Sequence, residues 1–375
     1  MKNIRLSKCS LGNEEIKSVS KILKSDFLGM GPNVLKFEKI LSNFFKRKAV
    51  CVSSGTSALH IALESLGLKK GDEVILSSLN YIAALQAVTA AGLTPVLCDI
   101  RLSDFSLCTN DLKKKLTKKT RVIMPTHYGG NAGNIDEIYK IAKLKKIRVI
   151  EDAAHAFNSF NKRKLIGSFG DICCFSFDGI KNITSGEGGC IVSSDKKIIK
   201  LSKEIRFLSI EKESENRYLK KKQFSFDVKR QGWRYHMSDI MAAIGIEQFY
   251  KINKFSRRRK QIAKIYSKKF QNNENIELLE IDYSLTTPHI FVIKLKKKFN
   301  RLKLTKWFKK FNIEIGFHWK PLHELSFFKK NFKSKNLNNT NYIKDKIITV
   351  PIHVDLSDRD INFVCKKVSQ FTYGR

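Results

Sequence analysis

The chain has 375 residues, 42% of them hydrophobic, and its 71 basic and 35 acidic side chains give a formal net charge of +36. This length and hydrophobic content predict a folded protein with room for two domains, and they exclude an intrinsically disordered chain. No apolar run reaches the ~18 residues of a membrane-spanning helix, and MKNIRLSKCSLGNEEI lacks the apolar core of a secretory signal, so we expect a cytoplasmic protein.

The first two thirds of the chain alternate between helical patterns and short apolar runs. Helices are expected at 13–24, 34–45, 55–68, 82–91 and 134–145, and strands at 49–54, 73–78, 95–100, 121–127 and 147–152. Pro32 lies just before the second helix, where a missing N–H costs little. Strands that are apolar throughout and alternate with helices indicate a mostly parallel sheet covered on both faces.

The pattern changes near Tyr250. A long basic helix is expected at 251–270, then a strand at 289–295 and helices near 303–311 and 358–371. We therefore expect an α/β protein with a large domain at 1–249 and a smaller C-terminal α/β domain at 250–375, on which the N-terminal segment can pack.

Two strand-like segments each end near an ionisable side chain. Asp152 follows VIE, and Lys181 follows ICCFSF and precedes the glycine-rich turn SGEGG. Ligands of open α/β sheets bind at the carboxyl edge of the strands, so the acid and the amine are expected to face one site. Pyridoxal phosphate (PLP) needs both groups, the lysine for a Schiff base and the acid for its pyridinium nitrogen.

Other positions fit the same cofactor, each with a plainer alternative. The turn Ser54-Gly55-Thr56-Ser57 joins a strand to a helix start, where backbone N–H groups hold anions, but serine and threonine are also ordinary N-caps. Tyr81 could stack on a pyridine ring or be a core or capping aromatic. His155 could bind a phenolic oxygen or be structural, and Ser176 could contact a phosphate.

The basic charge and the cysteines carry little functional signal. Lysine-rich runs occur at 113–119, 143–146, 220–222, 257–260 and 296–298. Their even spread fits an AT-biased coding composition better than a nucleic-acid groove, because no binding motif accompanies them. None of the eight cysteines forms a C-x-x-C pair, so we expect buried free thiols and no metal site.

Several blocks together resemble a known family. VSSGTSALHIAL, GDEVILSSLNYIAA, EDAAHA, FSFDGIKNITSGEGG and MSDIMAAIG are similar to segments of the DegT/StrS group of PLP-dependent nucleotide-sugar aminotransferases. This group belongs to the fold-type I aspartate aminotransferase superfamily. The resemblance runs from FLGMGPNVLKFE to ITVPIHVDLS and so covers almost the whole chain.

The resemblance implies a role for each candidate residue. Lys181 corresponds to the Schiff-base lysine and Asp152 to the pyridinium partner. The remaining cofactor contacts that it implies are the phosphate ligands Gly55, Thr56, Ser57 and Ser176, the ring-stacking Tyr81, and His155 near the ring hydroxyl. Some family members are dehydratases with histidine in place of the lysine, so Lys181 favours transamination.

Two segments depart from the family's pattern. GWRYHMSD has Arg234 where members commonly carry an asparagine that reaches the phosphate of the neighbouring subunit. Arginine can also bind phosphate, through its charged fork. In THYGGN, Gly130 replaces a frequent glutamine. The segment FHWKPLH resembles the wall on the sugar-nucleotide side and supplies His318, Lys320 and His323 as candidate substrate contacts.

The expected activity follows from this resemblance. It implies a homodimeric aminotransferase that moves an amino group from an amino acid, L-glutamate, to a nucleotide-diphosphate-linked keto-deoxy sugar. The product would serve surface polysaccharide, lipopolysaccharide or glycoconjugate synthesis. The alternatives are a PLP-dependent sugar dehydratase and a non-catalytic aminotransferase-like binding or regulatory protein; a nucleic-acid-binding protein ranks behind both.

Overall fold

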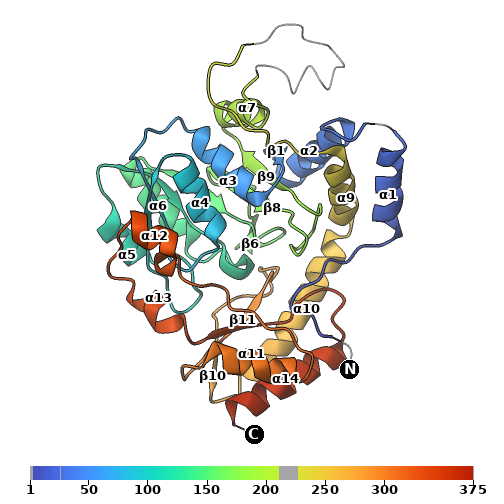
Figure 1. Cartoon of the computed structure of the whole chain (residues 1–375), viewed down its shortest axis with the longest axis vertical. Coiled ribbons are helices and arrows are strands. Elements are labelled where there is room, and N and C mark those ends of the chain that lie inside the picture. Colours follow the sequence, from blue (N-terminus) through green and yellow to red (C-terminus); the bar gives the residue numbers. More distant parts are fainter. Residues whose placement is uncertain (1–2, 26, 211–226, 375) are drawn as a thin grey trace.

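The computed structural model describes residues 3–25, 27–210 and 227–374, so the basic run at 220–222 lies outside the described residues. A seven-stranded sheet with the order β1-β9-β8-β5-β4-β2-β3 forms its larger part (Figure 1). Its strands are β1 (Lys48–Val52), β2 (Glu73–Ser77), β3 (Thr94–Cys98), β4 (Thr120–Met124), β5 (Arg148–Asp152), β8 (Ile172–Ser176) and β9 (Gly189–Ser193).

The sheet is mostly parallel, as the sequence predicted. β3, β2, β4, β5 and β8 run parallel to one another, while β9 is antiparallel to both β8 and β1. All five residues of β8 and of β9 are buried, because helices cover both faces of the sheet.

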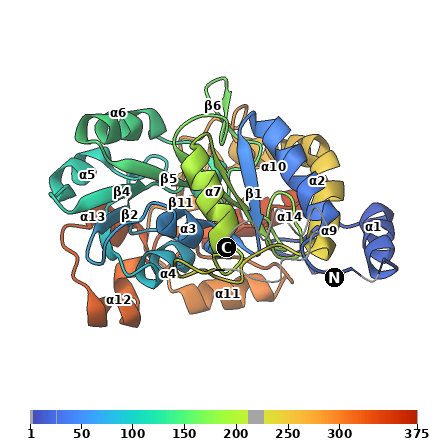
Figure 2. The ribbon, with the colours of Figure 1, turned by 90° about the horizontal axis from the view of Figure 1, so that it is seen from above.

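Successive residues of a strand point to opposite faces of the sheet and so belong to two separate hydrophobic cores. Val74 and Leu76 pack under α3 (Gly55–Glu64), α4 (Ile82–Ala90) and α7 (Lys196–Ile205), whereas Ile75 between them packs under α5 (Thr109–Lys115) and α6 (Ile135–Lys145). On this second face, α2 (Pro32–Phe45) and α9 (Asp239–Tyr250) cover the β1 end with a phenylalanine-rich core. Figure 2 shows these helices on the two sides of the sheet. The period-2 burial of each strand thus produces the three layers.

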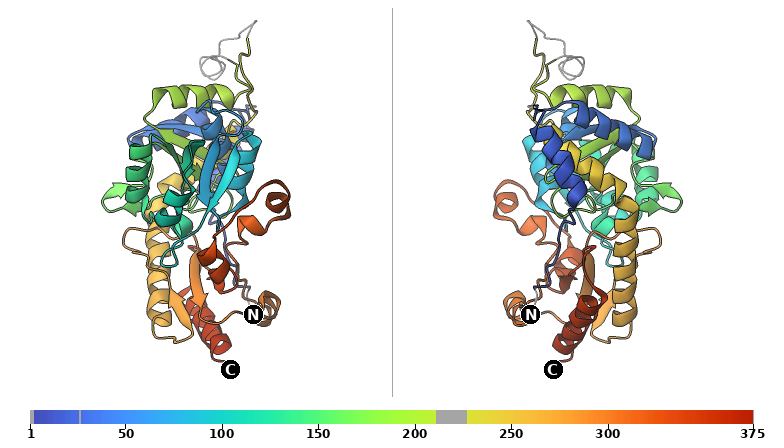
Figure 3. Two further views of the ribbon diagram at one scale, coloured as in Figure 1. Left: turned by 90° about the vertical axis from the view of Figure 1, so that its left-hand side faces the viewer. Right: turned by 90° about the vertical axis from the view of Figure 1, so that its right-hand side faces the viewer.

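A second, antiparallel sheet of order β10-β11-β12 lies below the first (Figure 3). It packs on α10, α11 and α14. The elements of this C-terminal part are α10 (Ile252–Phe270), β10 (Ile276–Leu278), β11 (Phe291–Leu295), α11 (Arg301–Lys309), η2 (Leu322–Glu324), α12 (Ser326–Asn331), α13 (Asn338–Ile343), β12 (Ile347–Val350) and α14 (Asp358–Thr372).

The N-terminal segment packs on this smaller sheet. Ile4 belongs to its core, and the Ile4 N–H donates to the carbonyl of Asn312 at 2.8 Å. The chain then continues into α1 (Asn13–Leu23), which packs on α9 of the larger part. The division of the chain at residue 250 stays a prediction.

The expected helices and strands formed within a few residues of their predicted bounds, and the described part of the chain has five further helices that were not predicted. The unpredicted helices are α5, α7, α9, α12 and α13; the remaining short elements are η1 (Tyr128–Gly130), β6 (Phe160–Asn161) and β7 (Lys164–Leu165). All eight cysteines are free, and six of them are buried. Within the described residues, every helix is too short or too polar to cross a bilayer.

One buried carboxylate holds the start of α2 in place. Asp239, the first residue of α9, is 2% exposed. It accepts hydrogen bonds from the N–H groups of Gly31, Asn33 and Val34 at 3.0–3.1 Å. These donors have no partner inside α2, because the first N–H groups of a helix lack an intrahelical acceptor.

We predict that Asp239→Ala lowers the free energy of unfolding by about 2–3 kcal/mol, because three backbone donors, two of them buried, lose a charged acceptor. Asp239→Asn, which keeps an oxygen acceptor, should lose about half as much. Urea titration followed by circular dichroism measures both, with the exposed Glu274→Ala as control. Equal stability of wild type and Asp239→Ala would contradict the capping role.

Candidate active site

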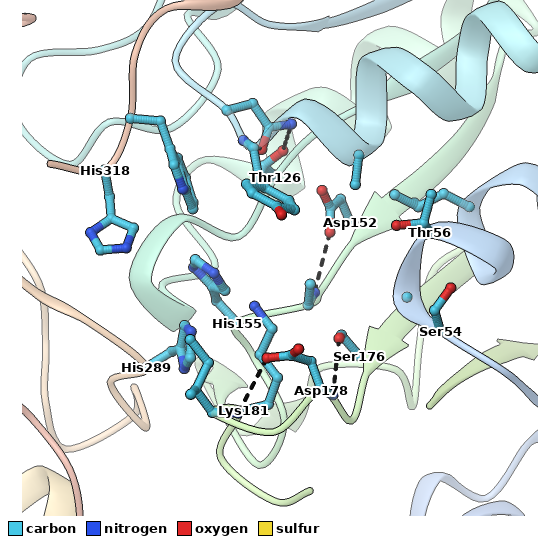
Figure 4. Close-up of a pocket in the computed structure, with 18 of the residues that line it drawn as sticks. Ser54, Thr56, Thr126, Asp152, His155, Ser176, Asp178, Lys181, His289 and His318 are labelled. Atoms are coloured by element: carbon cyan, nitrogen blue, oxygen red, sulfur yellow. Dashed lines mark hydrogen bonds between the residues drawn. The ribbon is translucent and has the colours of Figure 1, made fainter. Parts of the chain in front are cut away.

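A cavity of about 370 Å³ opens at the carboxyl edge of the large sheet. Both parts of the chain line it (Figure 4), with Ser54, Gly55, Thr56, Leu59, Asn80, Tyr81, Ala83, Thr126, Asp152, Ala154, His155, Ser176, Asp178, Ile180, Lys181 and Glu187 from the larger part and His289, His318 and Trp319 from the C-terminal part. Asp152 and Lys181 therefore line the same cavity, as their positions after neighbouring strands predicted.

Asp152 ends β5 and is 6% exposed. Backbone hydrogen bonds fix it against the end of β4, since its N–H donates to the Pro125 carbonyl at 2.9 Å and its carbonyl accepts from His127 at 3.0 Å. Burial raises the pKa of Asp152, while the Ala154 N–H, at 3.3 Å from the carboxylate, and the Lys181 amine oppose that shift. A buried carboxylate of this kind is stabilised by a cationic ligand group.

Lys181 lies in a tight turn that follows β8. Its N–H donates to the Asp178 carbonyl at 3.0 Å, and the Phe177 N–H donates to the Gly188 carbonyl at 2.7 Å. Burial lowers the pKa of Lys181, although the carboxylates of Asp178 and Asp152 oppose this. A larger neutral fraction makes the amine a better nucleophile and base at neutral pH.

The turn before α3 caps the helix, and two of its residues also line the cavity. The Ser54 hydroxyl accepts from the Ser57 N–H at 3.0 Å, and the Ser57 hydroxyl binds back to Ser54, so Ser57 belongs to the cap and does not line the cavity. Gly55 and Thr56 do line it, and their N–H groups lie in the first helical turn. A Cβ on Gly55 would lie 2.7 Å from Cβ of Ser176, so a side chain would fill this cradle.

Tyr81 stands at the mouth of the cavity. It is 55% exposed and so is not a core aromatic, but it does occupy the N-cap position of α4, without a side-chain capping hydrogen bond. Its ring centroid lies 6.3 Å from that of Trp319. Its N–H donates to the Asn80 side chain at 2.7 Å, and Asn80 in turn donates to the Thr126 hydroxyl at 2.7 Å. This chain of hydrogen bonds fixes the loops after β2 and β4.

Three histidines form one wall of the cavity. His155 packs against His289 with ring centroids 4.2 Å apart, and Trp319 lies 5.1 Å from His155. His318 shares a hydrogen bond with the Thr349 hydroxyl at 2.7 Å. Burial, with Lys181 as a secondary cause, lowers the pKa of His318 to about 4. Burial likewise holds the pKa of His155 and of His289 well below the ordinary range, so all three rings are neutral at pH 7.

Other sequence candidates lie outside this cavity. Lys320 and Arg234 are exposed. The segment that carries Arg234 pairs with the end of β1, where the Ser53 N–H donates to the Tyr235 carbonyl at 2.7 Å. His323 hydrogen-bonds Ser78 at 2.6 Å and Asn341 at 3.0 Å, and so links the large sheet to α13. A phosphate or substrate contact by these residues stays a prediction.

Gly130, the second departure from the family's pattern, has a structural reason. Its φ is +102°, and a Cβ there would lie 2.6 Å from the carbonyl oxygen of Thr287. A glutamine at this position would clash with the backbone that leads to His289. The loop after β4 can approach the C-terminal part closely because residue 130 has no side chain.

Several lining residues were missed by the sequence analysis. Asn80 and Thr126 lie two or three residues after the ends of β2 and β4. A position just after a strand also pointed to Asp152, so the same reasoning could have identified these two residues. His289 and Trp319 come from distant segments, and only tertiary packing brings them to the cavity.

We predict that the amine of Lys181 titrates below the ordinary lysine pKa, because burial disfavours its charged form. Labelling with a small amine reagent across pH 7–11, quantified on the Lys181 peptide by mass spectrometry, should give a midpoint below the ordinary lysine value of 10.5. Asp178→Asn should lower that midpoint further, since it removes an opposing carboxylate. A midpoint above 10.5 would contradict this electrostatic description.

Comparisons with known proteins agree with this geometry. Residues 9–369 match the model of the DegT/DnrJ/EryC1/StrS aminotransferase family. The chain is 35% identical to the uncharacterized protein MJ1066 of Methanocaldococcus jannaschii (96% of each chain covered) and 32% identical to the spore coat polysaccharide biosynthesis protein SpsC of Bacillus subtilis (97% and 96% covered).

The structure also superimposes on solved structures of sugar aminotransferases. The putative sugar aminotransferase Spr1654 of Streptococcus pneumoniae, solved in apo, PLP and PMP forms, has a TM-score of 0.92 and 26% identity; the apo form covers 100% of this chain and 99% of its own. The match of family model and fold over nearly the whole length places this chain in the DegT/DnrJ/EryC1/StrS aminotransferase family.

Proposed function

We propose that this protein is a PLP-dependent aminotransferase that transfers the amino group of L-glutamate to a keto-deoxy sugar carried on a nucleoside diphosphate. The observation that carries the proposal is that one cavity contains three groups that suit three parts of pyridoxal phosphate. It has a buried carboxylate at Asp152, an amine with a lowered pKa at Lys181, and an open helix N-terminus at Gly55 and Thr56. Membership of an aminotransferase family supports the reaction class.

These groups fit pyridoxal phosphate. The N–H groups of Gly55 and Thr56 with the Ser176 hydroxyl would hold the phosphate, and the α3 dipole favours the negative charge. Asp152 would pair with the ring nitrogen, and Lys181 would bind the aldehyde carbon. Tyr81 and His155 would contact the ring face and its hydroxyl. When bound, the cofactor supplies an electron sink for the carbanion at the substrate carbon.

The protein's own groups then have defined tasks. A carboxylate at Asp152 keeps its cationic partner protonated, because burial makes an unpaired charge there costly. Lys181, as a neutral amine, would take the proton from the donor's α-carbon as general base, and its ammonium form would then act as the general acid. The neutral imidazoles on the opposite wall add no competing positive charge.

The named relatives support the substrate class. Spr1654 is described as a putative sugar aminotransferase, and SpsC by its part in spore coat polysaccharide biosynthesis. We accordingly propose a role in surface polysaccharide or glycoconjugate synthesis in the cytoplasm. The charge of +36 would steer a nucleoside diphosphate toward the protein. A homodimer, in which Arg234 of one chain reaches the phosphate of the other, is part of the same proposal.

We predict that the protein aminates at least one nucleotide-linked keto sugar from a panel, with L-glutamate as donor, and that Lys181→Ala abolishes product. Mass spectrometry identifies the amino sugar. Borohydride reduction of the PLP-loaded protein should label the Lys181 peptide, and Lys164→Ala, at an exposed lysine, is the control. Labelling at another lysine would refute the assignment, and a deoxygenated product would identify a dehydratase instead.

A second prediction concerns the phosphate cradle. Gly55→Ala should weaken PLP binding about 10- to 100-fold, because the new methyl group collides with Ser176 and blocks hydrogen bonds to a charged group. Spectral titration of the apoprotein with PLP measures the affinity. Gly29→Ala is the matched control, since a Cβ there meets nothing within 4 Å. Unchanged affinity in Gly55→Ala would place the phosphate elsewhere.

A further inference from the structure

A buried arginine without an acidic partner lies behind the histidine wall. Arg259 of α10 is 2% exposed, and it forms no ion pair with a carboxylate in the described parts of the chain. Its Nη1 donates to the carbonyls of Pro288, His289 and Ile352 at 3.3–3.4 Å, and its Nε has no partner among the described residues. Burial lowers its pKa to about 10, so it stays cationic at pH 7. An unpaired buried charge is costly unless an anion approaches it.

His289 connects this charge to the cavity, because its carbonyl accepts from Arg259 and the residue lines the cavity. The residue is 4% exposed and lines the cavity beside His155 (Figure 4). Its Nδ1 is buried and has no hydrogen-bond partner in the described residues, as is also true of Nδ1 of His155. A buried polar atom without a partner in a native fold points to a ligand or water that satisfies it.

The charges of the cavity are divided between its two sides. The side formed by the large sheet carries the carboxylates of Asp152, Asp178 and Glu187 around the amine of Lys181. The wall from the C-terminal part carries His289 and His318, with the Arg259 cation behind them and no carboxylate among the lining residues. A cationic ring therefore belongs near Asp152, and an anionic group belongs at His289.

We infer that His289, supported by Arg259, binds the carboxylate of the amino donor and of the keto acid that it becomes. His289 would donate a hydrogen bond to the carboxylate, and Arg259 acts through His289 as a positioning residue. The inference rests on the proposed function, because it assigns a subsite to one substrate of that reaction.

Covalent geometry favours the carboxylate of the amino acid over the diphosphate of the nucleotide sugar as the anion bound at His289. The α-carboxylate is bonded to the carbon that reacts, so it must lie within a few ångströms of the Lys181 amine. Lys181 and His289 line the same cavity (Figure 4), so a carboxylate at His289 can stay bonded to a carbon within reach of the amine. In a nucleotide sugar, the pyranose ring separates the diphosphate from the reacting ketone, so the diphosphate belongs farther out, toward the mouth.

The test compares His289→Phe and His289→Asn in the PLP-loaded protein. Stopped-flow absorbance of the first half-reaction gives the apparent Kd of L-glutamate, which His289→Phe should raise about 10- to 100-fold through loss of a hydrogen bond to a charged group. His289→Asn keeps an N–H donor and should lose less. The apparent Kd of the keto sugar in the second half-reaction should stay within about twofold.

Three controls sharpen the result. A donor amine without an α-carboxylate, 4-aminobutyrate, should react with wild type and with His289→Phe equally well. His60→Asn alters another buried histidine, which packs on Trp233 away from the cavity, and should change neither Kd. Arg259→Met should weaken glutamate binding as His289→Phe does, while Arg259→Lys should retain most of it.

A binding measurement separates the inference from the proposed function. Calorimetric titration of the PLP-loaded protein with maleate, an unreactive dicarboxylate, should show binding that His289→Phe weakens at least tenfold. Maleate binding of this kind without any transamination would uphold the subsite and refute the proposed reaction. Transamination with an unchanged glutamate Kd in His289→Phe, or a raised Kd for the keto sugar alone, would overturn the subsite.

Discussion

The site depends on bringing one buried acid, Asp152, and one half-buried amine, Lys181, to the same edge of a sheet. β5 and β8 are parallel neighbours, and Asp152 pairs in register with Cys174 of β8. The chain then runs two residues further to Ser176 and turns, so that Lys181 faces back toward Asp152. Burial opposes the charged form of both groups. Each ion therefore gains most from the other, or from a cofactor held between them.

The loops around this pair are held by polar contacts that leave little freedom. A hydrogen bond between the side chains of Asn80 and Thr126 connects the ends of β2 and β4. The backbone of Thr126 also forms an isolated parallel β-bridge with that of Asp152. Close approaches at Gly55 and Gly130 allow backbone to pack where a side chain would not fit. Such a rim presents donors and acceptors in fixed positions, so little ordering is left to be done when a ligand binds.

Sequence reasoning reached those features that depend on short-range pattern. Strand–helix alternation gave the parallel sheet, and residues just after strands gave Asp152, Lys181 and the turn at Gly55. The sequence pattern did not indicate that β9 lies antiparallel between β1 and β8, because strand pairing is set by tertiary contacts. His289 and Trp319 were missed for the same reason, and Ser57 carries the same signal as Thr56 although its hydroxyl is used within the cap.

The wall that faces Lys181 is held mainly by apolar packing between the two parts of the chain. Leu79, Phe105 and Tyr128 of the larger part pack with Ile290 and Val292 of the smaller one. Tyr128 also donates a hydrogen bond to the carbonyl of His318. Because Asp152 and Lys181 belong to the sheet edge and His289, His318 and Trp319 to the opposite wall, the two sets of residues are physically separable. Under the proposed function, a substitution in the wall would change substrate binding and leave the positions of Asp152 and Lys181 unchanged.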